Sequence, residues 1–225
     1  MHFTSTALFL SLTSLSTALI HGVDSSAAVP VDTFKKALGQ GFVKAIPRGY
    51  FEACNSGGLV DPNFASSYKN AVAAGYKDID TYMFPCTGTT NKCKPYAEQI
   101  KGLLDAIAAD KMNIGTIWVD IESDDKVCHA WDYGAKGNLA EAKKLIEAVR
   151  ATKRKFGIYS SPGEWEKVFG SRDVEVDKSV PLWFATFDNV ETLDMKTPFG
   201  GWTKAAGKQY TDKSASGKFD LNVFA

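Results

Sequence analysis

The sequence lacks an excess of charge of either sign, because its 225 residues include 26 lysines and arginines and 26 aspartates and glutamates. Nucleic-acid binding needs a basic surface and electrostatic membrane attachment needs a polybasic patch, so neither class is favoured. Beyond the first eighteen residues, no apolar run resembles a transmembrane segment. The motifs G-x-S-x-G, H-E-x-x-H and G-x-G-x-x-G are also missing. We therefore expect no nucleic-acid or membrane partner, no metal or other cofactor, and a monomer.

Residues Met1 to Ala18 have the pattern of a secretory signal peptide. An apolar core covers residues 7–12, and Ser16 and Ala18 are small residues at the −3 and −1 positions of a cleavage site. The alternative is a buried N-terminal helix. The signal predicts a secreted, extracellular protein whose single domain covers residues 19–225.

Secretion predicts that the four cysteines form disulfides, for which three pairings exist. Cys86 and Cys93 bracket a short polar loop, while Cys54 and Cys128 each follow the end of an expected strand. We favour the pairing of Cys54 with Cys128 and of Cys86 with Cys93. A zinc site is the competing interpretation, but the sequence has no C-x-x-C spacing and only His129 lies near a cysteine.

Strand and helix patterns alternate along most of the chain. A helix ending at Gly75 follows Asp61-Pro62, and Asn138 with Glu141 predicts the start of another helix. Further helices are expected over residues 33–38, 95–110 and 162–169. Strands are expected over residues 19–24, 42–46, 78–84, 116–122, 156–160, 181–187, 207–211 and 219–224. The alternation predicts the α/β class, as a single-domain irregular (β/α) barrel resembling a TIM barrel, with a helix-poor C-terminal third.

Two carboxylates, Asp120 and Glu122, end the strand expected over residues 116–122. Side chains alternate along a strand, so both acids point the same way, with Cα atoms roughly 6.5 Å apart at about 3.3 Å per residue. In parallel α/β proteins, ligands bind at the carboxyl ends of the strands. Two carboxyls in one concave site can divide acid and base work, because burial and like charge separate their pKa values. The alternative is a pair of solvated acids opening a loop.

Acids recur at other strand ends, namely Asp24 and Asp220. Asp80 shares a strand face with Tyr82 and is either a further acid or a partner for Arg48. Acids among aromatic platforms suit a carbohydrate, because aromatic faces stack on sugar rings and two carboxyls can cleave a glycosidic bond. For each aromatic side chain, core packing is the alternative. The aromatic residues at these ends are Tyr82, Phe84, Tyr159, Trp183, Phe187 and Tyr210.

The ordered series of these motifs resembles glycoside hydrolase family 25, the Chalaropsis-type lysozymes, over nearly the whole mature chain. The pair Asp120 and Glu122 alone is a weak signal that chitinases share, whereas the ordered series is specific. The four cysteines lie outside the general family pattern and resemble additions of a secreted eukaryotic-type branch. The matching segments are residues 22–24, 61–64, 82–84, 118–122, 157–160, 181–185, 209–211 and 220–222, with Asn70, Ala73 and Gly75.

The resemblance implies cleavage of the β-1,4 bond between N-acetylmuramic acid and N-acetylglucosamine in the glycan strands of peptidoglycan. It implies that Glu122 is the general acid and that Asp24, Asp120 and Asp220 support it. Neighbouring carboxylates would raise the pKa of Glu122, as such a role requires. A retaining route assisted by the substrate's acetamido group and an inverting route both remain open. Substrate-binding residues are expected to be Tyr82, Phe84, Tyr159, Trp183, Gln209 and Tyr210.

One departure from the family is Phe187, where the family often has tyrosine; the adjacent Asp188 is a possible substitute contact. Two other functions compete with a muramidase. One is a catalytically inactive carbohydrate-binding barrel, against which the presence of all the acids counts. The other is a chitinase-like hydrolase, but its longer acidic run is missing, since Asn113, Thr116 and Trp118 stand at the preceding positions.

Overall fold

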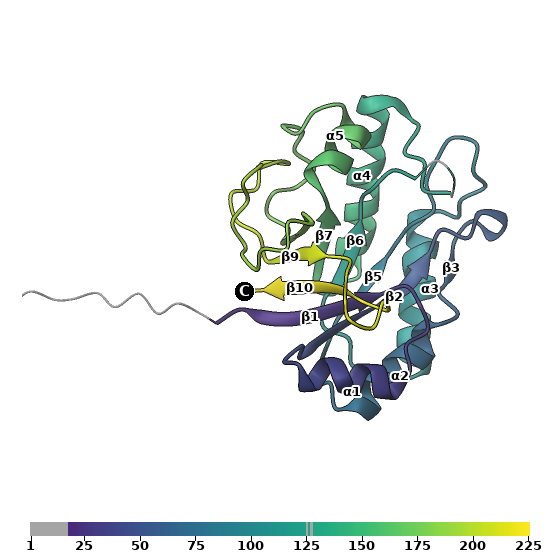
Figure 1. The fold of residues 1–225 in the computed structure, drawn as a ribbon. Helices are drawn as coiled ribbons and strands as arrows, with labels where there is room; N and C mark the ends of the chain where they lie inside the picture. Colours follow the sequence, from purple (N-terminus) through teal and green to yellow (C-terminus); the bar gives the residue numbers. More distant parts are fainter. Residues whose placement is uncertain (1–17, 125, 127) are drawn as a thin grey trace, which may run out of the picture.

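The fold was analysed in a computed structural model, which describes residues 18–124, 126 and 128–225 (Figure 1). The expected signal peptide, up to residue 17, lies outside the described residues. No helix among those residues is both long and apolar enough to cross a membrane.

Within the described residues, eight strands form a closed barrel. Neighbouring strands are parallel from β1 to β9, β10 is antiparallel to both β9 and β1, and the pairing of β1 with β2 closes the ring. This confirms the irregular barrel, whose last strand runs against the others. The strands are β1 (Ile20–Ser25), β2 (Lys44–Phe51), β5 (Thr81–Met83), β6 (Ile117–Asp120), β7 (Phe156–Ser160), β8 (Leu182–Ala185), β9 (Gly207–Thr211) and β10 (Asp220–Phe224). Two short strands that the sequence did not resolve, β3 (Leu59–Val60) and β4 (Asp78–Ile79), also pair with β2.

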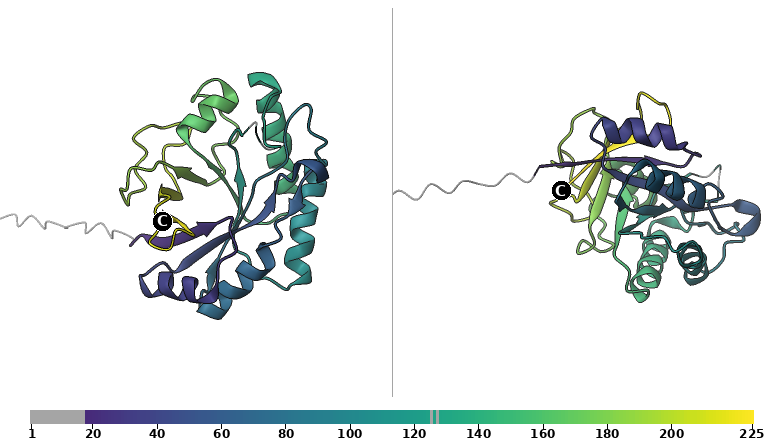
Figure 2. Two further views of the ribbon diagram at one scale, coloured as in Figure 1. Left: turned by 45° about the vertical axis from the view of Figure 1, so that its right-hand side comes forward. Right: turned by 90° about the horizontal axis from the view of Figure 1, so that it is seen from below.

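The helices surround the barrel except along β8 to β10, where the C-terminal segment runs without a helix (Figure 2). They are α1 (Val31–Gly39), α2 (Phe64–Ala74), α3 (Tyr96–Ala109), α4 (Gly134–Ala151) and α5 (Pro162–Phe169). The helix-poor C-terminal third is therefore confirmed. The predicted start of α4 at Asn138 is wrong, because the helix begins at Gly134. Asn138 is buried inside α4, where its amide donates to the carbonyls of Trp131 and Val168 and its oxygen accepts from the backbone N–H of Tyr133, just before the helix.

Alternating side chains divide the core into two layers. On β6, Ile117 and Val119 face the helices, while Trp118 faces the barrel interior. Gly157 on the neighbouring strand leaves room for the Trp118 ring, since a Cβ there would lie 2.2 Å from a ring carbon. The interior cluster consists of Ile46, Trp118, Tyr159, Trp183, Ala185 and Phe224. This apolar plug fills the barrel below its carboxyl end, so polar chemistry is confined to the mouth.

At the opposite end of the barrel, Lys44 is buried between two acids. Its Nζ donates to Asp78 at 2.7 Å and to Asp80 at 3.0 Å. Asp80 also accepts from the Trp118 indole at 3.0 Å, so it belongs to the barrel floor and is not a further acid of the mouth. The predicted alternative, a pair with Arg48, is also wrong, because Arg48 Nε donates to Asp61 at 2.7 Å. The strand expected over residues 78–84 is interrupted at Asp80, which lies between β4 and β5.

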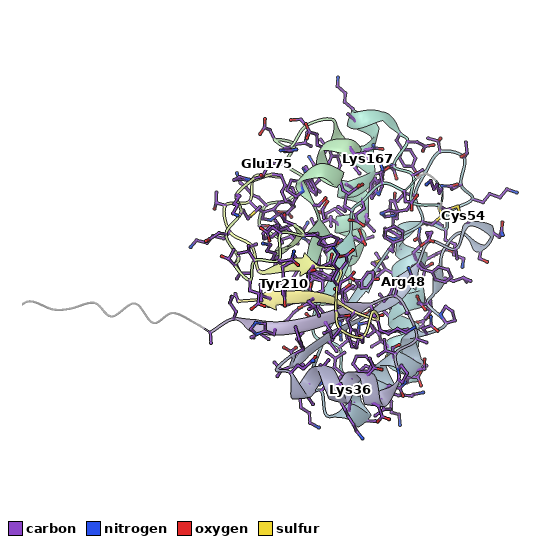
Figure 3. The ribbon with its side chains drawn as sticks, in the orientation of Figure 1. Lys36, Arg48, Cys54, Lys167, Glu175 and Tyr210 are labelled. Carbon is purple, nitrogen blue, oxygen red and sulfur yellow. A yellow bond between two sulfur atoms is a disulfide. The ribbon has the colours of Figure 1, made fainter. Side chains whose placement is uncertain are left out.

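Two disulfides join Cys54 to Cys128 and Cys86 to Cys93, as predicted, with Cα separations of 5.0 Å and 5.4 Å. Cys54 lies in a short 3-10 turn (Cys54–Ser56) after β2, at the edge of the loops in Figure 3. Because all four cysteines are bonded, none offers a thiolate to zinc. Both disulfides lie in the loops that follow the barrel strands, beside the mouth.

Candidate active site

A cavity of about 130 Å³ opens at the mouth of the barrel. It contains all four predicted acids and four of the six predicted binding residues. Larger hollows occur elsewhere, such as one of about 320 Å³ beside α1, but that one is lined by no acid. The chemistry of the lining therefore selects the smaller cavity, whose lining residues are Asp24, Tyr82, Asp120, Glu122, Tyr159, Trp183, Gln209 and Asp220.

A hydrogen-bonded network holds Asp24 on the wall of the cavity. Its Oδ1 accepts from the side-chain amides of Asn222 at 2.7 Å and Gln209 at 2.9 Å. Asn222 in turn accepts from the Trp183 indole at 2.9 Å, and Gln209 accepts from the Tyr159 hydroxyl at 2.7 Å. All the side chains of this hydrogen-bonded network are buried, so the network fixes the positions of the acid and of the aromatic side chains together.

Burial, followed by the charge of Asp220, raises the pKa of Asp24 to about 8, although the amides of Asn222 and Gln209 oppose the shift. Asp24 thus carries a proton at neutral pH. Because Oδ1 already accepts two N–H bonds, the proton belongs on Oδ2.

Asp120 ends β6 inside the mouth, where it is 4 % exposed. Its Oδ1 is buried and finds no hydrogen-bond partner among the described residues. Burial raises the pKa of Asp120 well above its usual range; the charges of Glu122 and Asp24 act in the same direction, and Arg48 opposes them. A buried carboxyl without a partner is costly, and such groups concentrate at functional sites.

Glu122 lies two residues beyond Asp120. Burial and then the charge of Glu164 raise its pKa to about 7, while Lys167, labelled on α5 in Figure 3, opposes the shift. Asp220, across the mouth on β10, has a pKa raised to about 6 by burial and then by Asp212. Carboxyls that retain protons near neutral pH can serve as general acids.

Two predicted binding residues lie outside the cavity lining. Tyr210 follows Gln209 on β9, so alternation turns its side chain to the other face of the strand, where it is buried near Glu191 (Figure 3). Phe84 packs on His129 with ring centroids 3.8 Å apart. Phe187 is 53 % exposed and does not line the cavity. Its neighbour Asp188 accepts from Lys208 at 2.6 Å and is occupied by that contact.

Three residues join the site that the sequence reasoning had not selected. Asn222 lies two residues after Asp220 on β10, so both side chains face inward. This alternation is a sequence signal that could have identified Asn222. Glu164 accepts from the backbone N–H of Ser123 at 2.8 Å, directly after Glu122. His129 accepts from the backbone N–H of Glu122 at 3.3 Å. Both of these contacts depend on loop conformation, and no sequence periodicity predicts them.

Comparisons with known proteins agree with this fold. A family model described as Lysozyme-like protein 1 matches residues 16–210. The chain is 35 % identical over 191 residues to Probable GH family 25 lysozyme 4 of Dictyostelium discoideum, covering 85 % of this chain and 83 % of that protein. It is 34 % identical over 210 residues to Lysozyme-like protein 5 of Caenorhabditis elegans, covering 93 % and 91 %. A solved muramidase from Trichobolus zukalii shares the fold, with a TM-score of 0.69, 19 % identity and coverage of 92 % and 93 %.

Proposed function

The chain belongs to the glycoside hydrolase family 25 lysozymes, and from this premise we propose that it cleaves the β-1,4 bond between N-acetylmuramic acid and N-acetylglucosamine in bacterial peptidoglycan. The observation that carries the proposal is the gathering of four carboxyls in one cavity at the barrel mouth. Three of them have pKa values raised to between about 6 and about 8, and that of Asp120 is raised as well.

Glu122 is the general acid in this proposal. Its pKa of about 7 leaves it protonated in mildly acidic and near-neutral solution. It gives this proton to the glycosidic oxygen as the bond to the leaving sugar breaks. A water molecule then adds its oxygen to the anomeric carbon of the sugar and gives up a proton, and the Glu122 carboxylate regains a proton, which returns the enzyme to its starting state.

Asp120 supports the positive charge that develops on the sugar. Asp120 lines the cavity, so its carboxyl can make this contact, either toward the sugar ring or toward the N–H of the 2-acetamido group. A buried carboxylate stabilises such charge strongly, because little water screens it. The anomer released first distinguishes the retaining, acetamido-assisted route from the inverting one, and NMR of an oligosaccharide digest measures it.

The remaining lining residues hold the substrate and the acids. The half-buried Tyr82 offers an aromatic surface to a sugar ring, and the buried Trp183 supports it from below, with the two rings 6.4 Å apart in an edge-to-face arrangement. Asp24, protonated on Oδ2, and Asp220 offer hydrogen bonds to sugar hydroxyls. Gln209 and Tyr159 fix these acids through the network described above.

The two disulfides favour an oxidising compartment, so we propose that residues 1–18 direct secretion. The substrate is then reached outside the cell as glycan strands, by a monomer. N-terminal sequencing of protein recovered from culture medium tests this, with Leu19 as the expected first residue. Retention of Met1 in a protein that stays inside the cell would contradict it.

The decisive experiment measures the release of reducing ends from purified peptidoglycan and, in parallel, from chitin, with the wild type and Glu122→Gln. We expect cleavage of peptidoglycan alone, reduced by about 10²- to 10⁴-fold in the variant, which keeps the shape and loses the acid. Asp120→Asn should also be severely impaired. Cleavage of chitin would favour a chitinase-like hydrolase. Binding of peptidoglycan without cleavage would identify an inactive carbohydrate-binding barrel.

A further inference from the structure

His129 lies fully buried directly behind Glu122, and its contacts define its tautomer. Its Nδ1 lies 2.6 Å from the carbonyl oxygen of Pro85, which can only accept, so Nδ1 carries the hydrogen. The Nε2 atom faces two donors, the backbone N–H of Glu122 at 3.3 Å and the indole N–H of Trp131 at 3.2 Å. His129 is therefore a neutral imidazole whose Nε2 lone pair points at the residue proposed to be the general acid.

The peptide of Glu122 needs this acceptor because the strand ladder has ended. The N–H of Ile121 still donates to the Tyr159 carbonyl at 2.9 Å, but β6 itself stops at Asp120. One residue later, the N–H of Glu122 is directed to the imidazole of His129. A buried peptide N–H without an acceptor is unfavourable, so this contact fixes the backbone from which the carboxyl projects.

The imidazole itself is held from several sides. The Phe84 ring packs against it at 3.8 Å, and the carbonyl of His129 accepts from the N–H of Asp124 at 3.0 Å. A disulfide flanks each end of the hydrogen-bonded pair, since Cys128 precedes His129 and Cys86 follows Pro85. These contacts fix the orientation of the imidazole ring, so that its Nε2 lone pair stays directed at the N–H groups of Glu122 and Trp131.

We propose that His129 is a positioning residue, which holds the peptide of Glu122 so that its carboxyl stays in the cavity with Asp120 and Asp220. The proposal rests on the role of Glu122 as the general acid. His129 does not contact the cavity and exchanges no proton with the substrate. Burial supports its neutral state by lowering the pKa of His129 to about 3, against the opposing effects of the Pro85 hydrogen bond and the Asp124 charge.

Charged groups from three elements and one loop also face the acid and contribute to any pH profile. They are Asp120 on β6, Asp220 on β10, Glu164 and Lys167 on α5, and Asp124 in the following loop. A substitution at His129 leaves all of them in place. A change in the pH profile of such a variant therefore reports the position of Glu122 and not the loss of a charge.

The test compares His129→Leu, His129→Gln and the matched control Trp131→Phe on peptidoglycan that the wild type cleaves. His129→Leu and Trp131→Phe both remove hydrogen bonding in the same buried cluster, but Trp131→Phe leaves the acceptor of Glu122 intact. We expect His129→Leu to lower kcat by about 10- to 100-fold with little change in KM. The basic limb of its pH profile should move to lower pH as Glu122 reaches solvent. His129→Gln, which retains an acceptor oxygen, should recover much of kcat, and Trp131→Phe should keep it.

Equal kcat and equal basic limbs in His129→Leu and Trp131→Phe would overturn the proposal. An inactive wild type would instead overturn the proposed function, so the two failures are distinguishable. If His129→Leu does not fold, ¹⁵N chemical shifts of His129 in the wild type decide. A protonated Nδ1 and an unprotonated Nε2 throughout the active pH range are expected, and the opposite tautomer or a protonated ring would refute the proposal.

Discussion

Replacement of Glu122 by glutamine should make the protein more stable than the wild type in alkaline solution, while it lowers activity by about 10²- to 10⁴-fold. The pKa of Glu122 is about 7 in the folded protein, against an ordinary value of 4.5. The folded state therefore binds the proton more tightly than the unfolded state. The free energy of unfolding of the wild type must fall as pH rises from the lower value through the higher one, and glutamine has no such dependence.

The magnitude follows from the two pKa values. Each tenfold change in proton affinity corresponds to about 1.36 kcal/mol, so the full difference is about 3.4 kcal/mol. Between about pH 5 and about pH 8, the wild type should lose about 2.5 kcal/mol relative to Glu122→Gln. Asp24 and Asp220 keep the causes of their raised pKa values in both proteins, so their contributions largely cancel in this comparison. Asp120 loses the Glu122 charge that helps to raise its pKa, and this loss adds to the difference between the two proteins.

Urea unfolding of both proteins at the two pH values, with disulfides intact, measures this difference. Glu98→Gln is a matched control, because Glu98 is an exposed glutamate on α3 and its substitution makes the same chemical change away from the cavity. If the difference between the wild type and Glu122→Gln is the same at both pH values, Glu122 ionises like an exposed acid. The physical basis of its proposed role would then be lost.

Three further predictions concern the framework. Cys54 and Cys128 are 74 residues apart, and Cys86 and Cys93 are 7 apart. Loop-closure entropy therefore predicts that replacing each pair by serine lowers the free energy of unfolding by about 4.5 and about 2.4 kcal/mol, respectively. Urea midpoints in the opposite order would contradict this ranking. Lys44→Met should cost about 3 to 5 kcal/mol by leaving the buried Asp80 without its cation, and the added substitution Asp80→Asn should recover part of that loss in the same assay. Gly157→Ala should cost about 1 to 3 kcal/mol or more, since the new Cβ meets the Trp118 ring at 2.2 Å; a melting temperature equal to that of the wild type would refute this packing argument.

The regular elements were predictable because short-range patterns determine them. A run of β-branched and aromatic residues identified β6, and the apolar spacing of residues 100, 103, 104 and 107 identified α3. Asn138 shows where this reasoning fails. A polar residue before an apolar stripe is typical of a helix cap, but α4 extends one turn further because Asn138 finds carbonyl acceptors on Trp131 and Val168. Those acceptors come from the tertiary structure, so no local pattern contains them.

The cavity was predictable to the extent that strand direction sets it. Parallel strands bring their carboxyl ends together, so Asp24 and Asp120 had to converge once the barrel was inferred. Gln209 and Tyr210 were both expected to bind substrate, yet adjacent residues of a strand face opposite ways and only Gln209 lines the cavity. His129 and Glu164 accept hydrogen bonds from backbone N–H groups of the loop after β6, namely those of Glu122 and Ser123. No periodic sequence pattern predicts the conformation of such a loop.

Asp24 and Asp80 show why residue type alone cannot separate a structural acid from a chemical one. Both lie at the ends of short strands, and both are buried. Asp80 meets the ammonium group of Lys44, a full positive charge at 3.0 Å. Asp24 meets only the neutral amides of Asn222 and Gln209, which are too weak to offset burial and the charge of Asp220, and its pKa remains at about 8. The difference is the partner supplied by the neighbouring strand, since β2 carries Lys44 beside Asp80 and β10 carries Asn222 beside Asp24. A cation at the floor fixes an acid in place, whereas amides at the mouth hold an acid and let it keep its proton, which is the state that chemistry at the mouth requires.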